Sequence, residues 1–223
     1  MAVARFEKLM KNLGTGVVAQ FGVIILAVWI WVAVLRTPVI LFSGHPLAQS
    51  FGLLALVQAI LILQPAHTVQ QKRSGRIAHG FLNALSFASF VAGVTIIEYN
   101  KFSSGGIHFH SVHGYFGVIT SVVLLLQYFV GFTMWLVPGM YGGVDKAKSL
   151  YRYHRMSGYI ILLLLLVTVV TATKTEFNEK VLKLQLWGAI LLAFLIAAGV
   201  YPRLQRTKLG FGPVRLTGAT GQH

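Results

Sequence analysis

The stretch YHRMSGYIILLLLLVTVVTAT, from Tyr153 to Thr173, decides the fold class of this chain. After Arg155 it carries no charged side chain and is dominated by leucine, isoleucine and valine. A helix needs about 20 mostly apolar residues to cross the hydrocarbon core of a bilayer. An apolar run of this length is typical of a membrane-spanning segment. The stretch therefore predicts a transmembrane helix.

Five further stretches have the same character, so the sequence predicts six membrane-spanning helices. The composition agrees, because 56% of the 223 residues are hydrophobic and 11% are charged, against roughly a quarter charged in soluble domains. Short connections predict antiparallel neighbours in one bundle. We therefore expect an all-α polytopic membrane protein, built as a bundle of six transmembrane helices. The expected spans are Val17–Leu35, Leu47–Leu63, Ile77–Ile97, Val112–Val137, Tyr153–Thr173 and Val181–Tyr201.

The basic residues predict how the chain is oriented in the bilayer. The formal net charge is +14, with 19 Lys and Arg against five acids, and such an excess is also typical of nucleic-acid-binding proteins. With six spans, however, most of these residues fall on one side of the membrane, and basic segments stay cytoplasmic during insertion. We therefore expect both termini in the cytoplasm, contacts with anionic lipid headgroups of the bilayer, and no nucleic-acid partner. The basic residues on the cytoplasmic side are Arg5, Lys8, Lys11, Lys72, Arg73, Arg76, Lys146, Lys148, Arg152, Arg155, Arg203, Arg206, Lys208 and Arg215, and those on the other side are Arg36, Lys101, Lys174, Lys180 and Lys183.

This topology predicts three segments: a cytoplasmic N-terminal segment over residues 1–16, a six-helix transmembrane domain over 17–201, and a cytoplasmic tail over 202–223. The chain has no cysteine, so neither a disulfide nor a thiolate metal site is available. No lipidation or retention motif is present. The sequence therefore leaves the plasma membrane and the endomembranes open as locations.

Four of the eight histidines lie near the start of a predicted helix: His45, His79, His113 and His154. Successive helices alternate in direction, so these histidines alternate between the two halves of the membrane. His45 and His113 belong to the non-cytoplasmic half, and His79 and His154 to the cytoplasmic half. The sequence therefore supplies one pair of histidines for each leaflet.

Paired histidines inside a membrane indicate metal chemistry. Ionisable residues are costly there and usually face the interior of a bundle with a function, and neutral imidazole is a common metal ligand. Two imidazoles from facing helices can ligate a haem iron axially, which leaves no open position and favours electron transfer over oxygen binding. Two such haems would divide the roughly 30 Å of hydrocarbon into shorter steps. In the alternative interpretation, the four histidines lie at the membrane interface and bind nothing. This alternative does not explain why they alternate between the two halves of the membrane.

Glycines follow two of these histidines by four residues, on the same helix face. Gly117 follows His113 and Gly158 follows His154. A missing side chain beside a ligand leaves room for a flat macrocycle. Equally, small residues allow helices to pack closely in membranes, so the glycines do not separate the two interpretations.

At these positions the chain resembles the cytochrome b561 family, over nearly its whole length. The similarity is closest to the short six-helix branch, the b561-domain-containing or tumour-suppressor type, which has no appended extracellular domain. Gln49 stands where the family often has methionine, and the stretch around His113 departs from that of the ascorbate-oxidising members. The matching stretches are Leu41-Phe42-Ser43-Gly44-His45-Pro46, Lys72-Arg73-Ser74-Gly75-Arg76 before His79, Val112-His113-Gly114, and Leu150-Tyr151-Arg152-Tyr153-His154.

The resemblance implies a four-helix haem core formed by the second to fifth helices and two haem b groups. It implies that His79 and His154 hold the cytoplasmic haem, and that His45 and His113 hold the other. Cytosolic ascorbate or a related reductant would donate electrons, and monodehydroascorbate or a ferric chelate would accept them on the far side. The resemblance also implies a homodimer. The expected activity is that of a transmembrane ascorbate-dependent reductase.

Candidate substrate residues lie beside the histidines at both ends. An anionic donor favours a basic entrance, so Lys72, Arg76 and Arg152 are candidates on the cytoplasmic side, although their charges also suffice as topology signals. His108 and His110 are candidates for binding metal ions on the other side, or are simply solvated loop residues. The alternative function is a histidine-lined transporter of metal ions, but such sites usually need carboxylates, and the chain has five acids. A non-catalytic membrane scaffold is the third possibility.

Overall fold

The computed structural model describes residues 2–63 and 68–204, and of residues 2–13 the backbone alone. The described residues form six α-helices and no strand. All six helical segments are long and apolar enough to cross a membrane, which confirms the predicted fold class and the number of spans. The helices are α1 (Ala2–Leu35), α2 (Gly44–Ile62), α3 (Val69–Ser104), α4 (Val112–Leu136), α5 (Val144–Ala172) and α6 (Leu186–Val200). Short η segments are η1 (Leu41–Ser43), η2 (Pro138–Tyr141), η3 (Asn178–Leu182) and η4 (Tyr201–Arg203).

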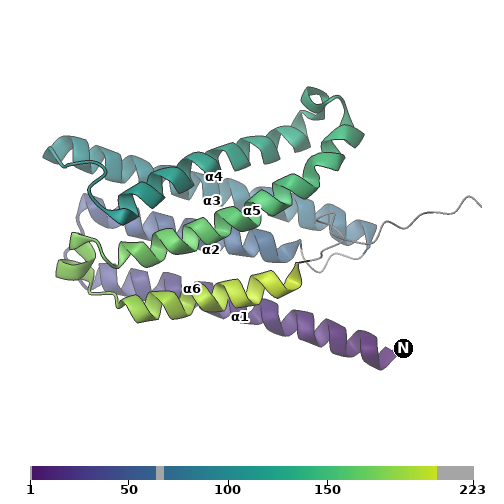
Figure 1. Ribbon diagram of the computed structural model, residues 1–223, viewed down its shortest axis with the longest axis horizontal. Coiled ribbons are helices and arrows are strands. Elements are labelled where there is room, and N and C mark those ends of the chain that lie inside the picture. The colour runs from purple at the N-terminus through teal and green to yellow at the C-terminus, as the bar shows by residue number, and fades with distance from the viewer. Residues whose placement is uncertain (1, 64–67, 205–223) are drawn as a thin grey trace, which may run out of the picture.

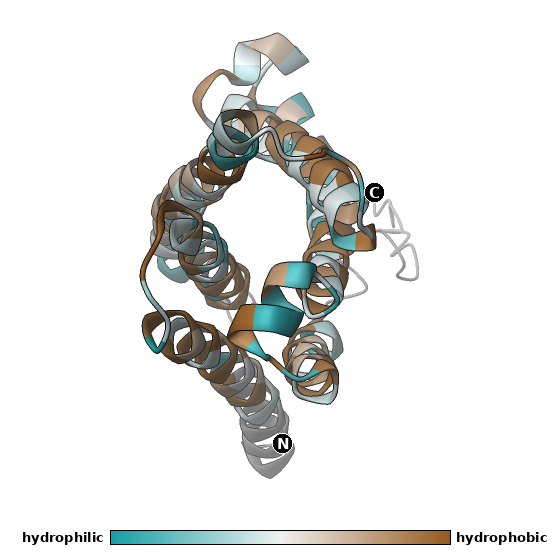
Figure 2. Ribbon diagram, turned by 90° about the vertical axis from the view of Figure 1, so that its left-hand side faces the viewer, coloured by the Kyte–Doolittle hydropathy of each residue, from teal (hydrophilic) through white to brown (hydrophobic). Residues whose placement is uncertain are grey.

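The helices run along one common axis and alternate in direction (Figure 1). The beginning of α1 and the end of α6 lie at the same end of the bundle, together with the turn between α4 and α5. Seen from the opposite end, α2 to α5 surround a central axis, and α1 and α6 lie to one side (Figure 2). Helices that follow one another therefore place their starts at opposite ends, as the histidine register requires.

The hydrophobic core lies on the side of the bundle formed by α1, α2, α5 and α6. Its fully buried members include Leu26, Leu53, Leu162 and Ile196, one from each of these helices. Helix α3 packs along α2, and α4 packs along α5, whereas α3 and α4 touch at few points. The many exposed leucine, valine and phenylalanine side chains on the outside are those that a bilayer would cover.

Helices α3 and α5 start before the apolar stretches that predicted them. Thr68 forms a capping box with Gln71, in which each side chain bonds the other's backbone N–H. This cap satisfies N–H groups that a helix start leaves free, so α3 begins in polar sequence at Val69. Helix α5 begins at Val144 after Gly143, whose φ of 109° is accessible to glycine. Both helices therefore extend past the apolar core, a length that hydropathy does not predict.

The start of the sixth span was predicted wrongly, because the chain between α5 and α6 is a distinct connector (residues 173–185). Helix α6 begins at Leu186 rather than Val181. The side-chain amide of Asn178 donates to Thr173 O and Leu184 O and accepts from Leu184 N. Lys183 adopts a left-handed conformation with φ 55°, which a residue with a Cβ adopts at a cost of about 1–2 kcal/mol. These features end the π-turn of η3 before α6 starts.

The predicted terminal segments are only partly described. The backbone of α1 is helical from Ala2, so residues 2–16 continue the first helix beyond the predicted span. Residues 205–223, which hold most of the predicted tail with Arg206, Lys208 and Arg215, lie outside the described residues.

Candidate functional site

The four histidines lie on four different helices, two toward each end of the bundle. His45 is near the start of α2, and His113 is near the start of α4. His79 lies in α3 and His154 in α5, toward the other end. All four side chains are half-buried. The structure therefore brings together the two pairs that the sequence predicts.

The imidazoles of His45 on α2 and His113 on α4 lie next to each other, edge-on. Their ring centroids are 6.3 Å apart, and the ring planes are inclined by 79°. Metal–imidazole bonds are about 2 Å long. A metal ion bound on a straight line between two Nε2 atoms would therefore hold the centroids a little more than 6 Å apart. The distance between the two rings is therefore compatible with one iron that both imidazoles would hold.

The Nδ1 atoms of three histidines lie against backbone carbonyl oxygens of the neighbouring helix. His45 Nδ1 is 2.8 Å from Gly93 O, His79 Nδ1 is 2.8 Å from Ala59 O, and His113 Nδ1 is 2.9 Å from Thr168 O. A carbonyl oxygen can only accept, so each Nδ1 carries the proton and donates it. This tautomer leaves the lone pair on Nε2, and metal-binding histidines are commonly fixed in this way.

His154 differs from the other three histidines. It lies close enough to His79 for the two imidazoles to interact electrostatically, but its buried Nδ1 has no hydrogen-bond partner among the described residues. Its ring instead packs against Gly131 of α4, where a Cβ would approach His154 Cε1 to 2.8 Å. The position of this ring therefore depends on the missing side chain of Gly131.

A spacing of 14 residues recurs on all four helices. Fourteen residues after each histidine, the same helix carries a group that forms a hydrogen bond with the histidine on the neighbouring helix. Fourteen residues make nearly four helical turns and rise about 21 Å, so the group lies on the same face as the histidine. The two histidine levels are therefore separated by about this distance. The groups are Ala59 O for His79, Gly93 O for His45, Thr168 O for His113, and Gln127, whose amide donates to His154 O at 2.7 Å.

The two glycines that follow His113 and His154 by four residues have different surroundings. A Cβ at Gly158 would approach Gln127 Nε2 to 3.1 Å, so this glycine serves close packing of α5 on α4. A Cβ at Gly117 would meet no atom within 4 Å among the described residues. Gly117 lies on the His113 face of α4 and leaves open space there, as a flat cofactor would need.

Polar and aromatic groups that the sequence reasoning missed complete the site. Tyr128 Oη donates to Ser86 Oγ at 2.8 Å, and Ser86 Oγ donates to Gly52 O at 2.7 Å. Ser86 lies midway between His79 and Gly93 on α3, so this chain of hydrogen bonds joins α4, α3 and α2 between the two histidine levels. No sequence motif marks these partners, because serine and tyrosine are common in membrane helices.

An aromatic contact joins the connector to the first pair. Phe42 stacks on His45 with ring centroids 5.8 Å apart and meets Phe177 edge-on at 4.5 Å. Phe42 thus fills the space between the His45 ring and the connector. This contact excludes water from one side of the imidazole.

Each histidine pair has one basic residue within electrostatic range. Lys101 acts on His45 and His113, and Arg155 acts on His154. Each histidine pair therefore has a positive charge close to it.

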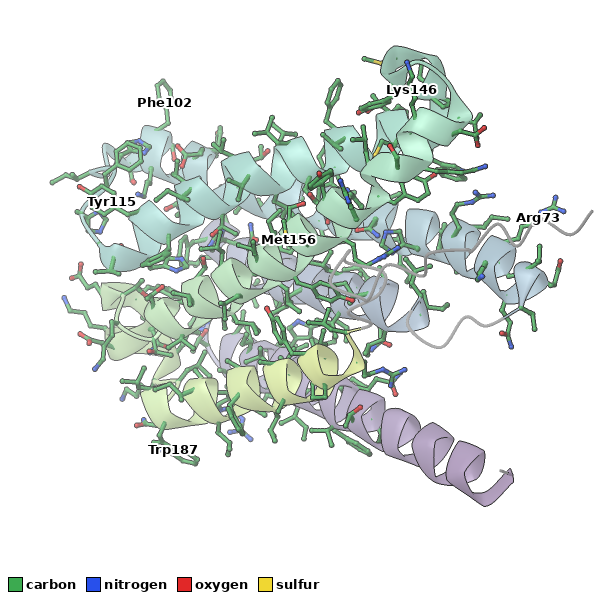
Figure 3. All side chains as sticks on the ribbon, turned by 45° about the vertical axis from the view of Figure 1, so that its right-hand side comes forward. Arg73, Phe102, Tyr115, Lys146, Met156 and Trp187 are labelled. Atoms are coloured by element: carbon green, nitrogen blue, oxygen red, sulfur yellow. The ribbon has the colours of Figure 1, made fainter. Side chains whose placement is uncertain are left out.

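The predicted donor-side residues lie at the end of the bundle near His79 and His154. Lys72, Arg76 and Arg152 are exposed, and the three ion pairs of the described residues include none of them. Arg152 donates to Tyr153 Oη at 2.6 Å and lies 4.6 Å from the centre of its ring. Figure 3 shows Arg73 and Lys146 at the same end of the bundle. This end is therefore a basic surface.

The structure does not bring His108 and His110 together at one metal site. His108 Nδ1 lies 3.4 Å from a carboxylate oxygen of Glu98, whereas His110 donates from Nδ1 to Ile107 O at 2.8 Å. Phe109 between them has φ 55°. Both histidines lie in the loop before α4, at the end where Figure 3 shows Phe102 and Tyr115.

Among the described residues no group of three or more histidine, cysteine, aspartate or glutamate side chains could hold a metal ion. A permeation path for metal ions would need such groups, with carboxylates among them. Two imidazoles suffice for a haem, whose macrocycle supplies the other ligands. Within this part of the chain, the arrangement favours haem binding over metal transport.

Known proteins with similar sequences agree with this chemistry. The family described as eukaryotic cytochrome b561 matches residues 44–179, which include all four paired histidines. A transmembrane ascorbate-dependent reductase of Mus musculus is 30% identical over 99 residues, which are 44% of this chain and 39% of the relative. The corresponding protein of Sus scrofa is 28% identical over 166 residues, 69% of this chain and 64% of the relative.

A lysosomal membrane ascorbate-dependent ferrireductase of Rattus norvegicus is 28% identical over 145 residues, 64% of this chain and 54% of the relative. In each of these three alignments the chain spans less than two thirds of the relative's length. The matched region contains the whole of α2 to α5. The similarity is thus concentrated in the helices that carry the histidine pairs.

Proposed function

The chain belongs to the eukaryotic cytochrome b561 family, and on this basis we propose that it carries electrons across a membrane between two haem b groups. Membership of the family implies haem b as the cofactor. We propose two haems per chain, one held by His45 and His113 and the other by His79 and His154. The protein would then be a transmembrane ascorbate-dependent reductase.

One observation carries this proposal: the 6.3 Å separation of the His45 and His113 rings. The two side chains come this close although α2 and α4 are not packed along each other. Both Nδ1 protons are donated outward to carbonyl oxygens. The two Nε2 lone pairs are therefore available to one iron.

A haem with two axial imidazoles supplies one-electron transfer without an open coordination position. The chain's own residues prepare each level for it. Backbone carbonyls hold three imidazoles in one tautomer, Phe42 shields His45 from water, and Gly131 admits the ring of His154. The two levels lie about 21 Å apart along the helices, which shortens the distance that an electron must cross in one step.

We propose that the donor is cytosolic ascorbate or a related anionic reductant. The relatives from Mus musculus, Sus scrofa and Rattus norvegicus are all named for ascorbate dependence. The exposed basic groups of Lys72, Arg76 and Arg152 lie at the His79 and His154 end. A concentration of positive charge there would attract an anion. This assignment also agrees with the proposed topology, in which that end faces the cytoplasm.

On the opposite side we propose monodehydroascorbate or a ferric chelate as the acceptor. One relative is named a ferrireductase. His108 with Glu98 offers an imidazole and a carboxylate next to each other at this end, and His110 lies two residues further on. The wider biological unit that we propose is a multi-pass protein with both termini cytoplasmic, arranged as a homodimer in the bilayer.

The test uses the full chain purified from membranes in detergent. Its visible spectrum is recorded before and after addition of ascorbate, and the haem-to-protein ratio is measured. We expect a low-spin b-type spectrum, about two haems per chain, and reduction by ascorbate. A folded protein without haem absorbance would contradict the proposal, and reduction by dithionite alone would remove ascorbate as the donor.

Single variants then test the two pairs separately. His45→Ala and His79→Ala are each expected to reduce the haem content from two to one, because each removes a ligand from a different level. His110→Ala is the matched control, since His110 is exposed and bonds only within its loop. Loss of haem from the control to the same extent would mean that histidine content, not pairing, determines binding.

A further inference from the structure

A cleft lies between the end of α1 and the connector, outside the four helices that carry the histidine pairs. Its volume is about 280 Å³. No residue of α2, α3 or α4 lines it. The lining residues are Trp29, Val32, Ala33, Arg36, Thr37, Val181, Leu182, Lys183 and Leu184. The cleft is therefore distinct from the proposed haem sites.

One wall of the cleft is apolar. A Cβ at Gly188 of α6 would approach the Trp29 ring to 2.8 Å, so the indole lies directly on the backbone of α6. Val32 and Val181 are each 39% exposed at the edge of the cleft. This wall can accommodate a hydrocarbon chain, which needs only apolar surface.

The charged groups of the cleft are both positive. Arg36 and Lys183 are its charged residues, and no acid lines it. The three ion pairs of the described residues involve neither of them. The hydroxyl of Thr37 donates to Val34 O at 2.8 Å, so the guanidinium and the ammonium are the charged donors that a ligand would meet in the cleft. The cleft therefore selects a negatively charged group.

The position of Lys183 is fixed by the connector. Its left-handed backbone, with φ 55°, follows directly after the π-turn that Asn178 closes with three hydrogen bonds. Residues held in sparsely populated backbone regions persist when the surrounding structure determines them, and they often mark binding sites. Here the strained residue is also one of the two cations of the cleft.

The cleft lies at the edge of the membrane. The first span ends at Leu35 and the last begins at Leu186, so Arg36 and Lys183 lie just beyond the apolar segments while Trp29 lies within one. Tryptophan and basic side chains are typical of this interfacial depth. At that depth a phosphate and an acyl chain are present in the same molecule.

We propose that this cleft binds one anionic phospholipid, with the phosphate between Arg36 and Lys183 and an acyl chain against Trp29. The phosphate of an anionic lipid such as phosphatidylglycerol carries an uncompensated negative charge, whereas the ammonium group of a zwitterionic lipid is repelled by Arg36 and Lys183. The chemistry that the cleft recognises is a phosphate group without a neighbouring cation. The apolar wall assigns the lipid rather than a soluble phosphate.

The test measures lipid retained by the full-length purified protein, so it does not depend on haem content. The protein is incubated with equal amounts of phosphatidylglycerol and phosphatidylcholine in detergent, and bound lipid is counted by native mass spectrometry. Two basic contacts predict a preference for phosphatidylglycerol on the order of 30-fold. Equal retention of both lipids would overturn the proposal.

The double variant Arg36→Gln with Lys183→Gln is expected to abolish this preference. The matched control is Lys174→Gln with Lys180→Gln, which removes the same number of positive charges at the same end of the bundle and should retain the preference. If the control loses it equally, or the first variant keeps it, the cleft is not the site. Gel filtration and circular dichroism establish that each variant is folded.

A second variant tests the cleft without changing its charge. Ala33→Phe fills the space and keeps both cations, and it should also abolish the preference for phosphatidylglycerol. Retention of lipid by this variant would place the site elsewhere. Addition of millimolar inorganic phosphate distinguishes the two sources of the anion: unchanged lipid binding supports the proposal, whereas displacement of the lipid would assign the cleft to a soluble phosphate.

Discussion

The substitution Gly131→Ala tests the second histidine pair at the point where the structure makes it most sensitive. The new Cβ would lie 2.8 Å from His154 Cε1 and 3.4 Å from its Nε2. Ordinary contact begins at 3.4 Å, so the ring must move away. Because His154 Nδ1 has no hydrogen bond among the described residues to hold it, the imidazole rather than the backbone should yield.

A displaced imidazole is a poorer ligand, because a metal–nitrogen bond of about 2 Å tolerates little stretching. Changes to groups that orient a ligand typically cost 10–100-fold in metal affinity, which corresponds to about 1.4–2.7 kcal/mol. We expect Gly131→Ala to weaken haem binding at the His79 and His154 level by this factor and to leave the other level unchanged. The assay is haem content and visible spectrum after dilution into haem-free buffer.

The control for this prediction is Gly139→Ala. Gly139 lies in η2, between α4 and α5, and a Cβ there would meet no atom within 4 Å among the described residues. This variant should bind both haems as the unchanged protein does. If Gly131→Ala also retains both haems with unchanged affinity, the placement of His154 against Gly131 is not what positions this ligand, and the reasoning fails.

Three further substitutions test the packing that supports the site, each by the free energy of unfolding in detergent. Tyr128→Phe removes the hydrogen bond to Ser86 and should cost about 1 kcal/mol, because Ser86 keeps its other bond; a cost near zero would contradict it. Asn178→Ala leaves buried backbone groups of the connector without partners and should cost about 2–3 kcal/mol, whereas no change would mean that the connector is held otherwise. Gly199→Ala places a Cβ against the backbone nitrogen of Ala19 and should separate α1 from α6 at a cost of about 3 kcal/mol, and tolerance of this change would refute the close helix contact.

Hydropathy and the histidine register predicted the general architecture. Six apolar stretches gave six spans, because the bilayer imposes a minimum length on each helix. Alternating helix direction then determined which histidines share an end, so His45 with His113 and His79 with His154 were predicted without any contact information. The family was also predicted from the sequence, and the match over residues 44–179 confirms it.

The details that position each imidazole could not be predicted in the same way. Backbone carbonyls of Gly93, Ala59 and Thr168 accept the Nδ1 protons, and a carbonyl oxygen has no signature in a sequence because every residue carries one. The glycine that contacts a histidine ring is Gly131, on the partner helix, rather than the residue four positions later on the same helix. Such contacts depend on how two helices pack, which local spacing does not determine.

The exact helix boundaries also could not be predicted from the sequence. Apolar runs mark where a helix lies in hydrocarbon, but α3 starts at Val69 in polar sequence because Thr68 caps it. At the sixth span the apolar residues Val181 and Leu182 suggested helix, yet both belong to the connector. The competing interaction is the side chain of Asn178, whose three hydrogen bonds favour a turn over continued helix.

The recurring 14-residue spacing has a consequence for how such a protein could be assembled. His45 and His79 are each held by a carbonyl within the α2–α3 hairpin, and His113 is held within the α4–α5 hairpin. Each hairpin thus carries two imidazoles, one at each level, and largely determines the orientation of these imidazoles by itself. The two hairpins share the same arrangement of histidines, and each would contribute one ligand to each proposed haem site. The ribosome delivers the two hairpins one after the other, so the first can be oriented in the bilayer before the second is made. The proposed haem sites would then form only when the two hairpins pack together.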